Sequence, residues 1–157
     1  DGDLFNSGVR PAINVGISVS RVGGNAQIKA MKKVSGTLKL DQAQFRELEA
    51  FAKFGSDLDA VTLNVIEKGR RNVEILKQAQ NDPFKVEDQI AIIYAGSKNL
   101  LRAVPVNKVK EFETEYIEFL RAKHSDVLAT LKSGKLTDEV TDTLTAVAKE
   151  LSSKYTA

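Results

Sequence analysis

The residues best suited to chemistry lie in one short stretch, Arg10 to Gly24. An apolar run from Ile13 to Val19 is rich in β-branched side chains and predicts a short buried strand. Arg21 follows this run, and Gly23 and Gly24 come next, where a backbone can turn sharply. A guanidinium mounted at the end of a strand is a fixed cation with a planar fork of donors, which suits a phosphate group. The simpler alternative is an arginine that ends the strand with its charge in water.

The sequence lacks the other parts of a phosphate-hydrolysing site. The pattern Gly-x-x-x-x-Gly-Lys-Ser/Thr, whose backbone cradles phosphates, does not occur. Ser133-Gly134-Lys135 has no upstream glycine and falls between two predicted helices, so we interpret it as a turn. The chain has no Cys and one histidine, His124, which excludes a thiolate or multi-histidine metal site. We expect no metal site in this chain and no hydrolysis of ATP by this chain alone.

Length and charge narrow the class further. The chain has 157 residues, enough for one ordinary domain, and 42% of them are hydrophobic. The 23 basic and 21 acidic residues are interspersed and give a net charge of +2, so nucleic acid is not an expected partner. No apolar run approaches the roughly 20 residues that span a bilayer, and no signal peptide pattern appears. These features favour a soluble protein on the cytosolic side.

From about Asn25 onward, apolar residues recur with the period of an α-helix. We predict five or six amphipathic helices joined by short turns, over 26–54 (one helix or two, with a weak point at 35–37), 56–76, 86–104, 107–133 and 137–151. The predicted fold class is therefore all-α, a helical bundle preceded by a short extended segment. A single strand cannot make a sheet by itself, so this segment needs a partner from outside the chain.

Several motifs together resemble one known family. They are Arg10 to Gly24 followed by Ala26-Gln27, then Gln44 to Leu48, Phe51 to Ala60, Leu76 to Gln80 and Ile92 to Gly96. In this order and spacing they resemble the C-terminal third of F-type ATP synthase alpha subunits. The resemblance implies that residues 1–27 are the end of an incomplete α/β nucleotide-binding domain, which would supply the missing sheet. Residues 28–157 would then form the C-terminal helical domain.

The resemblance also implies roles for single residues. The arginine at the position of Arg21 reaches across a subunit interface to nucleotide in a neighbouring beta subunit, as a catalytic arginine finger. Arg10, Pro11, Gln78 and Gln80 correspond to residues that line the adenine at a second, non-catalytic nucleotide site. Glutamine amides can donate to and accept from an adenine edge. From the residues alone, the favoured interpretation of the two glutamines is that they are exposed residues at a helix end.

The turn before the second predicted helix carries Ser56, Asp57 and Asp59. Two acidic side chains at a helix N-terminus interact favourably with the helix dipole, so their presence needs no other explanation. The resemblance places this turn near the rotating central stalk, so a contact with the gamma subunit is the competing interpretation.

The resemblance implies a setting for the whole protein. ATP or ADP with Mg²⁺ would bind the complete subunit, whereas none is expected on this fragment alone. The partners would be beta subunits in an alternating ring and the gamma subunit of the stalk. The complex would couple proton transport to ATP synthesis on the cytoplasmic face of a bacterial inner membrane, or in the mitochondrial matrix or chloroplast stroma. This chain would reach the membrane only through the complex.

Two alternatives stay open. A free-standing helical interaction module without a nucleotide role would fold Ile13 to Val19 within the chain and cover it with its own bundle, whereas in a member of the family this stretch would be unpaired, misplaced or paired between copies. The second alternative is a beta subunit or a vacuolar-type relative of similar architecture. The Ser18 to Gly24 and Lys77 to Gln80 motifs favour the alpha subunit.

Overall fold

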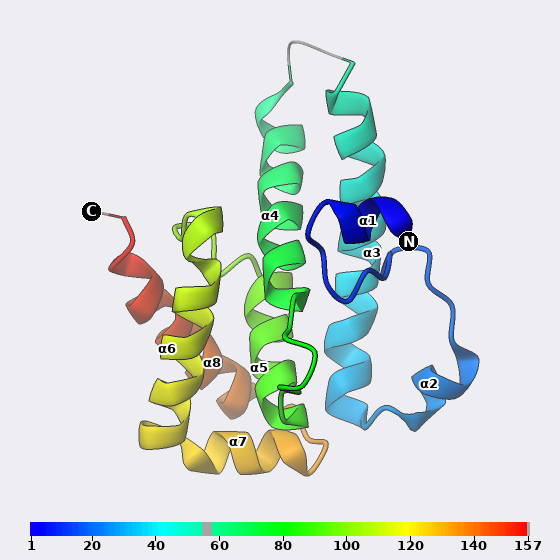
Figure 1. Ribbon diagram of the computed structural model, residues 1–157. Helices are drawn as coiled ribbons and strands as arrows, with labels where there is room; N and C mark the ends of the chain where they lie inside the picture. The colour runs from blue at the N-terminus through cyan, green and yellow to red at the C-terminus, as the bar shows by residue number, and fades with distance from the viewer. Residues whose placement is uncertain (55–57, 157) are drawn as a thin grey trace.

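The protein is all-helical in the part of the chain described by the structure, a computed structural model that describes residues 1–54 and 58–156. Figure 1 shows the arrangement of the helices. Their bounds in chain order are α1 Gly2–Asn6, α2 Arg21–Ala26, α3 Lys29–Ala52, α4 Ala60–Leu76, α5 Val86–Ser97, the 3₁₀-helix η1 Val106–Lys108, α6 Val109–Lys123, α7 Ser125–Lys132 and α8 Asp138–Ser153.

Helix α5 forms the centre of the bundle. It packs against α3, α4, α6, α7 and α8. Its residues from Ile90 to Ile92 and from Tyr94 to Ser97 are all buried, on every side of the helix. A helix that is apolar all round belongs in a core rather than at a surface. The amphipathic helices around it each place one apolar face against α5 or against one another.

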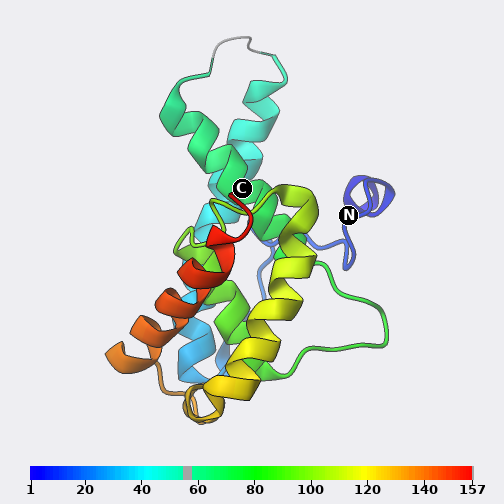
Figure 2. The same ribbon diagram turned by 90° about the vertical axis from the view of Figure 1, so that its left-hand side faces the viewer.

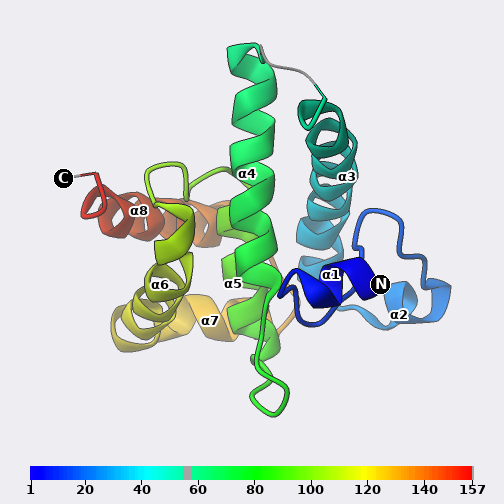
Figure 3. The same cartoon turned by 45° about the horizontal axis from the view of Figure 1, so that its top comes forward.

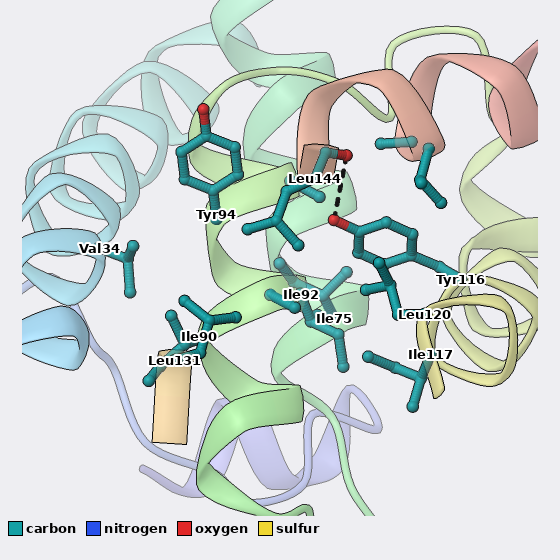
Figure 4. Close-up of a cluster of buried hydrophobic side chains, with 14 of the residues drawn as sticks. Val34, Ile75, Ile90, Ile92, Tyr94, Tyr116, Ile117, Leu120, Leu131 and Leu144 are labelled. Atoms are coloured by element: carbon teal, nitrogen blue, oxygen red, sulfur yellow. Dashed lines mark hydrogen bonds between the residues drawn. The ribbon is translucent and has the colours of Figure 1, made fainter. Parts of the chain in front are cut away.

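The core that surrounds α5 is closed by large side chains from α6 and α8 (Figure 4). Phe112 and Tyr116 stack with ring centroids 5.5 Å apart. The Tyr116 hydroxyl donates a hydrogen bond of 3.3 Å to the carbonyl oxygen of Leu144, so its polar group is satisfied although it is buried. Burial raises the pKa of Tyr116 well above its ordinary value. The side chains of this core come from α3 to α8 and from the loop between α5 and η1.

Helices α3 and α4 form an antiparallel hairpin that extends beyond the other helices (Figure 1). The two helices come close where Gly69 of α4 meets Phe45 of α3. A Cβ on Gly69 would lie 2.5 Å from the Cβ of Phe45 and closer still to two ring atoms, so only glycine fits. The buried Gln42 amide also donates to the Gly69 carbonyl at 3.2 Å. The glycine inside this helix is therefore a packing requirement.

The strand predicted over Ile13 to Val19 is wrong, because no strand occurs anywhere in residues 1–54 or 58–156. The fold is thus all-α without the extended strand segment of an α/β domain. The stretch forms a turn, in which the Ser18 N–H donates to the Asn14 carbonyl at 2.9 Å. A β-branched run needs a neighbouring strand for its backbone groups, and this chain supplies none in its described part. The hydrogen bonds that the run makes are local or come from the Lys39 side chain, which donates to the Ser18 carbonyl oxygen at 2.6 Å.

The prediction that Arg21 follows the end of a strand and precedes a Gly-Gly turn is wrong as well, because Ile13 to Val19 form no strand. Ser20 caps α2, its hydroxyl accepting from the Gly23 N–H at 3.0 Å, and Arg21 is the first residue of that short helix. Gly23 and Gly24 therefore lie inside a helix instead of forming a turn. Figures 1 and 3 both show α2 standing apart from the bundle, beyond α3.

Smaller boundaries also differ from the prediction. Helix α3 runs unbroken through 35–37. The helix predicted over 107–133 is two helices, α6 and α7, which meet at His124. Asn107 does not cap α6, since it lies within η1. Thr137 caps α8 as expected, its hydroxyl accepting from the Val140 N–H at 3.3 Å.

Candidate functional site

The N-terminal segment lies against the loop that follows α4, and a backbone hydrogen bond joins them. The Gln78 N–H donates to the Arg10 carbonyl oxygen at 3.0 Å. The loop leaves the bundle on the side where the N-terminal segment lies (Figure 2). The Arg10 guanidinium lies 4.2 Å from the centroid of the Phe5 ring, a cation–π contact within the N-terminal segment. Two predicted site residues, far apart in sequence, therefore stand side by side.

A cavity of about 400 Å³, shallow and open to solvent, lies between these segments and helix α6. This volume falls within the range of small-molecule sites, about 300–1,000 Å³. Its walls combine an aromatic ring, an amide and groups of both charges; the lining residues are Gly8, Arg10, Lys77, Gln78, Ala79, Asp82, Phe84, Lys110, Glu113 and Thr114. The side-chain amide of Gln78 makes no hydrogen bond within the described part of the chain, so its donors and acceptor are available.

An ion pair between a partly exposed lysine, Lys110, and a buried glutamate, Glu113, forms the α6 side of the cavity. Glu113 is 4% exposed, and its two carboxylate oxygens accept from the Lys110 ammonium at 3.0 and 3.3 Å. The same ammonium donates to the backbone carbonyl of Lys77 and lies 5.6 Å from the centroid of the Phe84 ring. Burial raises the pKa of Glu113, while the charge of Lys110 opposes that shift.

The sequence analysis missed Lys110 and Glu113. The available signal was an acidic residue on the apolar face of the predicted helix, four residues after Val109 and three before Tyr116. Both of these neighbours are buried, so a carboxylate between them had to be buried as well. The contact of Lys110 with the Lys77 carbonyl oxygen, in the loop after α4, could not be inferred from spacing.

Pro11 lines a second hollow of about 190 Å³, next to Asn14, Arg46 and Val73. Gln78 lines both hollows. Gln80 lies in the turn after Gln78, is exposed and lines neither of the two hollows. The structure thus brings Arg10, Pro11 and Gln78 into one region and leaves Gln80 at its edge.

Arg21 is exposed at the start of α2 and does not line these hollows. Among the described residues, it has no ion-pair partner.

Asp59 is the N-cap of α4. Its carboxylate accepts from the backbone N–H groups of Val61 and Thr62 at 2.8 and 2.9 Å and from the Thr62 hydroxyl at 2.7 Å. These hydrogen bonds, the one from the Thr62 hydroxyl first, lower the pKa of Asp59. Capping therefore accounts for this acid. Ser56 and Asp57, predicted with it, lie outside the described residues.

Exposed apolar side chains gather near this end of the hairpin. Phe51, Phe54 and Val61 are all exposed, Phe54 to 92%. A group of large apolar side chains in water is a common mark of an interaction surface.

Metal-binding clusters and membrane-spanning helices are both absent from residues 1–54 and 58–156. No group of three or more acidic, histidine or cysteine side chains is placed to hold a metal ion there. No helix among those residues combines the length and the hydropathy needed to cross a membrane.

The helical bundle belongs to a known class. The model of the family "ATP synthase alpha/beta chain, C terminal domain" matches residues 27–151. This match covers most of the chain, so the chain belongs to that family.

Curated relatives place the chain more narrowly. It is 78% identical over 155 residues to ATP synthase subunit alpha of Flavobacterium johnsoniae, covering 99% of this chain and 30% of the relative. It is 80% identical over 153 residues to the same subunit of Christiangramia forsetii, covering 98% of this chain and 29% of the relative. For Parabacteroides distasonis the identity is 60% over 150 residues, covering 95% and 29%. The chain thus spans about 30% of the length of these relatives. The resemblance to alpha subunits, inferred from the sequence, is confirmed.

Proposed function

We propose that this chain is the C-terminal part of the regulatory, non-catalytic alpha subunit of a proton-translocating F-type ATP synthase. The family match over residues 27–151 and relatives at 78% and 80% identity support this proposal. The exposed apolar residues at the end of the N-terminal stretch support it too. Ile17 and Val19 are 75% and 84% exposed, whereas a free-standing helical module would cover them with its own bundle.

The chain's own contribution is part of a non-catalytic nucleotide site. One observation carries this: the Gln78–Arg10 hydrogen bond brings two predicted adenine residues to one cavity of about 400 Å³. The residues present fit an adenine base, because the Gln78 amide can pair with a base edge and Phe84 adds an aromatic wall. Pro11 in the adjoining hollow and Gln80 at its edge would complete the surroundings of the base.

ATP or ADP with Mg²⁺ would be held mainly by the rest of the complete subunit. This chain has no phosphate-binding loop, so its residues hold only the base. We therefore expect the isolated chain to bind ATP negligibly and to be inactive as an ATPase. The bound nucleotide would link the N-terminal segment to the bundle without being turned over.

A second contribution is made in trans by Arg21. In an alternating ring its exposed guanidinium would meet the terminal phosphate of nucleotide held by a neighbouring beta subunit. A permanent positive charge with several donors stabilises the charge that develops on a transferring phosphoryl group. The proposal for Arg21 rests on the family resemblance and on the exposure of the side chain.

The hairpin end would face the gamma subunit of the central stalk. Its exposed Phe51, Phe54 and Val61 supply an apolar surface, beside the Asp59 cap, that fits this role. The assembled complex would work at the cytoplasmic face of a bacterial inner membrane, with this chain reaching the membrane only through its partners.

The adenine site is tested in the complete, assembled complex by measuring ATP bound at the non-catalytic sites. Gln78→Ala should weaken that binding by about tenfold, the effect of losing a hydrogen-bonding group from a polar site. Gln44→Ala, which removes an exposed amide on α3, is the matched control and should leave it unchanged. Normal ATP occupancy in the Gln78→Ala complex would refute the assignment.

A further inference from the structure

Lys110 has an unusual set of contacts for a residue outside the family motifs. Its ammonium group contacts the Glu113 carboxylate, the Lys77 carbonyl oxygen and the face of the Phe84 ring. An ammonium has three donors, so it can hold a carboxylate and a carbonyl at once. Lys110 thereby connects helix α6 to the loop after α4.

The carbonyl of Lys77 and the N–H of Gln78 belong to one peptide group. Lys110 holds the carbonyl, and the Arg10 carbonyl oxygen accepts from the N–H at 3.0 Å. Because a peptide group is planar, fixing both of its polar atoms fixes the orientation of the whole plane. That plane fixes where the backbone nitrogen of Gln78 lies, and so limits the region that its side chain can reach. The loop has no helical hydrogen bonds of its own at this point.

Glu113 in turn holds Lys110. Its carboxylate is 4% exposed and lies three residues further along α6, where an i,i+3 pair can meet. A buried carboxylate without its cation would be costly, so the Lys110 ammonium is held at Glu113 although its side chain is 42% exposed. The ion pair thus holds the Lys110 ammonium where it can donate to the Lys77 carbonyl oxygen of the loop.

We propose that Lys110, supported by Glu113, is a positioning residue for adenine recognition, which aims the Gln78 amide at the base through the 77–78 peptide group. This inference rests on the proposed nucleotide site. Lys110 itself need not touch the base. The chemical group that Gln78 would recognise is the exocyclic amino group of adenine, which its amide oxygen can accept from.

The test compares two nucleotides at the non-catalytic sites of the complete complex: ATP and purine riboside triphosphate, which lacks the 6-amino group. Lys110→Met removes the ammonium and keeps most of the apolar stem. It should weaken ATP about tenfold and purine riboside triphosphate less than about twofold, because only ATP offers the group that Gln78 recognises. Lys110→Arg keeps a cationic donor and should restore most of the ATP affinity.

Two further variants make the test specific. Lys108→Met is the matched control, since it removes an exposed i,i+3 pair with Glu111 at 2.8 Å and should change neither affinity. Glu113→Gln keeps a polar partner for Lys110 without the charge and should reduce the preference for ATP by a smaller factor. It also serves as the test should Lys110→Met fail to assemble.

The possible outcomes separate this inference from the proposed function. Equal weakening of both nucleotides by Lys110→Met, or no weakening, would overturn the positioning role if Gln78→Ala still weakens ATP selectively. Failure of Gln78→Ala to separate the two nucleotides would instead remove the adenine assignment itself.

Discussion

Replacing Gly69 with alanine should destabilise the bundle, although alanine is the better helix former. In an unhindered helix the change would stabilise by about 1 kcal/mol. At Gly69 the new Cβ would lie 2.5 Å from the Cβ of Phe45, closer than Cβ atoms approach other atoms in proteins. Phe45 is buried in the α3–α4 contact and cannot move into solvent, so the two helices must separate.

The magnitude follows from two opposing terms. Overpacking in a core costs about 1–3 kcal/mol, and the severity of this contact places it at the upper end. After the helix propensity gain of about 1 kcal/mol is subtracted, the net loss is about 2 kcal/mol. For a chain of this length that corresponds to a fall in Tm of roughly 4–8 °C. Equilibrium urea unfolding and thermal melting, both followed by far-ultraviolet circular dichroism, measure these quantities.

Gly36 provides the matched control. It lies in α3, where an added Cβ would meet no atom within 4 Å apart from its chain neighbours and the backbone of its own helix. Gly36→Ala should therefore stabilise by about 0.5–1 kcal/mol. The two substitutions are chemically identical, but they should change the free energy of unfolding in opposite directions. If Gly69→Ala raised Tm as Gly36→Ala does, the close packing of α3 on α4 would be wrong.

Three other perturbations test separate features. Arg21→Ala in the complete complex should reduce ATP turnover by roughly 10³-fold while the ring still assembles; near-normal turnover would remove Arg21 from the mechanism. Asn72 is fully buried, and the nitrogen and oxygen of its amide both lack a hydrogen-bond partner in the described residues. Asn72→Leu should therefore raise the free energy of unfolding, measured in urea, by about 1–2 kcal/mol. A lower free energy of unfolding would show that the amide is satisfied. The folded-state pKa of Glu113 is raised above its ordinary 4.5, so the folded state holds this proton more tightly, and stability should fall as pH rises from about 4.5 through the raised pKa. Glu113→Gln should lack this component, and parallel pH profiles for the two proteins in urea unfolding would contradict the burial of this charge.

Local signals predicted most of the helices. The Thr137 cap and the apolar period after it sufficed for α8, because a cap and the face it orients lie within a few residues of each other. Gly134 has a φ of +86°, the left-handed conformation expected of a glycine that ends a helix. In each case the determining interactions are within one or two turns.

The errors came where the determining interaction was not local. The β-branched pattern of Ile13 to Val19 predicted a strand, but strand formation depends on a neighbour that the described part of this chain does not have. The break between α6 and α7 at His124 is not marked by a glycine or a proline in the sequence. It occurs where the chain changes direction and α7 packs on α5. The contacts of Lys110 with Lys77 across the cavity likewise depend on tertiary structure.

Two segments far apart in sequence line the cavity, so the binding of a ligand there would affect how stably they contact each other. The N-terminal segment is joined to the α4–α5 loop there by the hydrogen bond between Gln78 and Arg10, while Ile17 and Val19 nearby in sequence stay exposed. A ligand that binds only when both walls are in place stabilises their contact by the free energy of its binding. By the same linkage, anything that fixes the N-terminal segment against the bundle increases affinity for the ligand. We therefore expect nucleotide at this site to act as a tether between the helical domain and the part of the subunit that holds the phosphates.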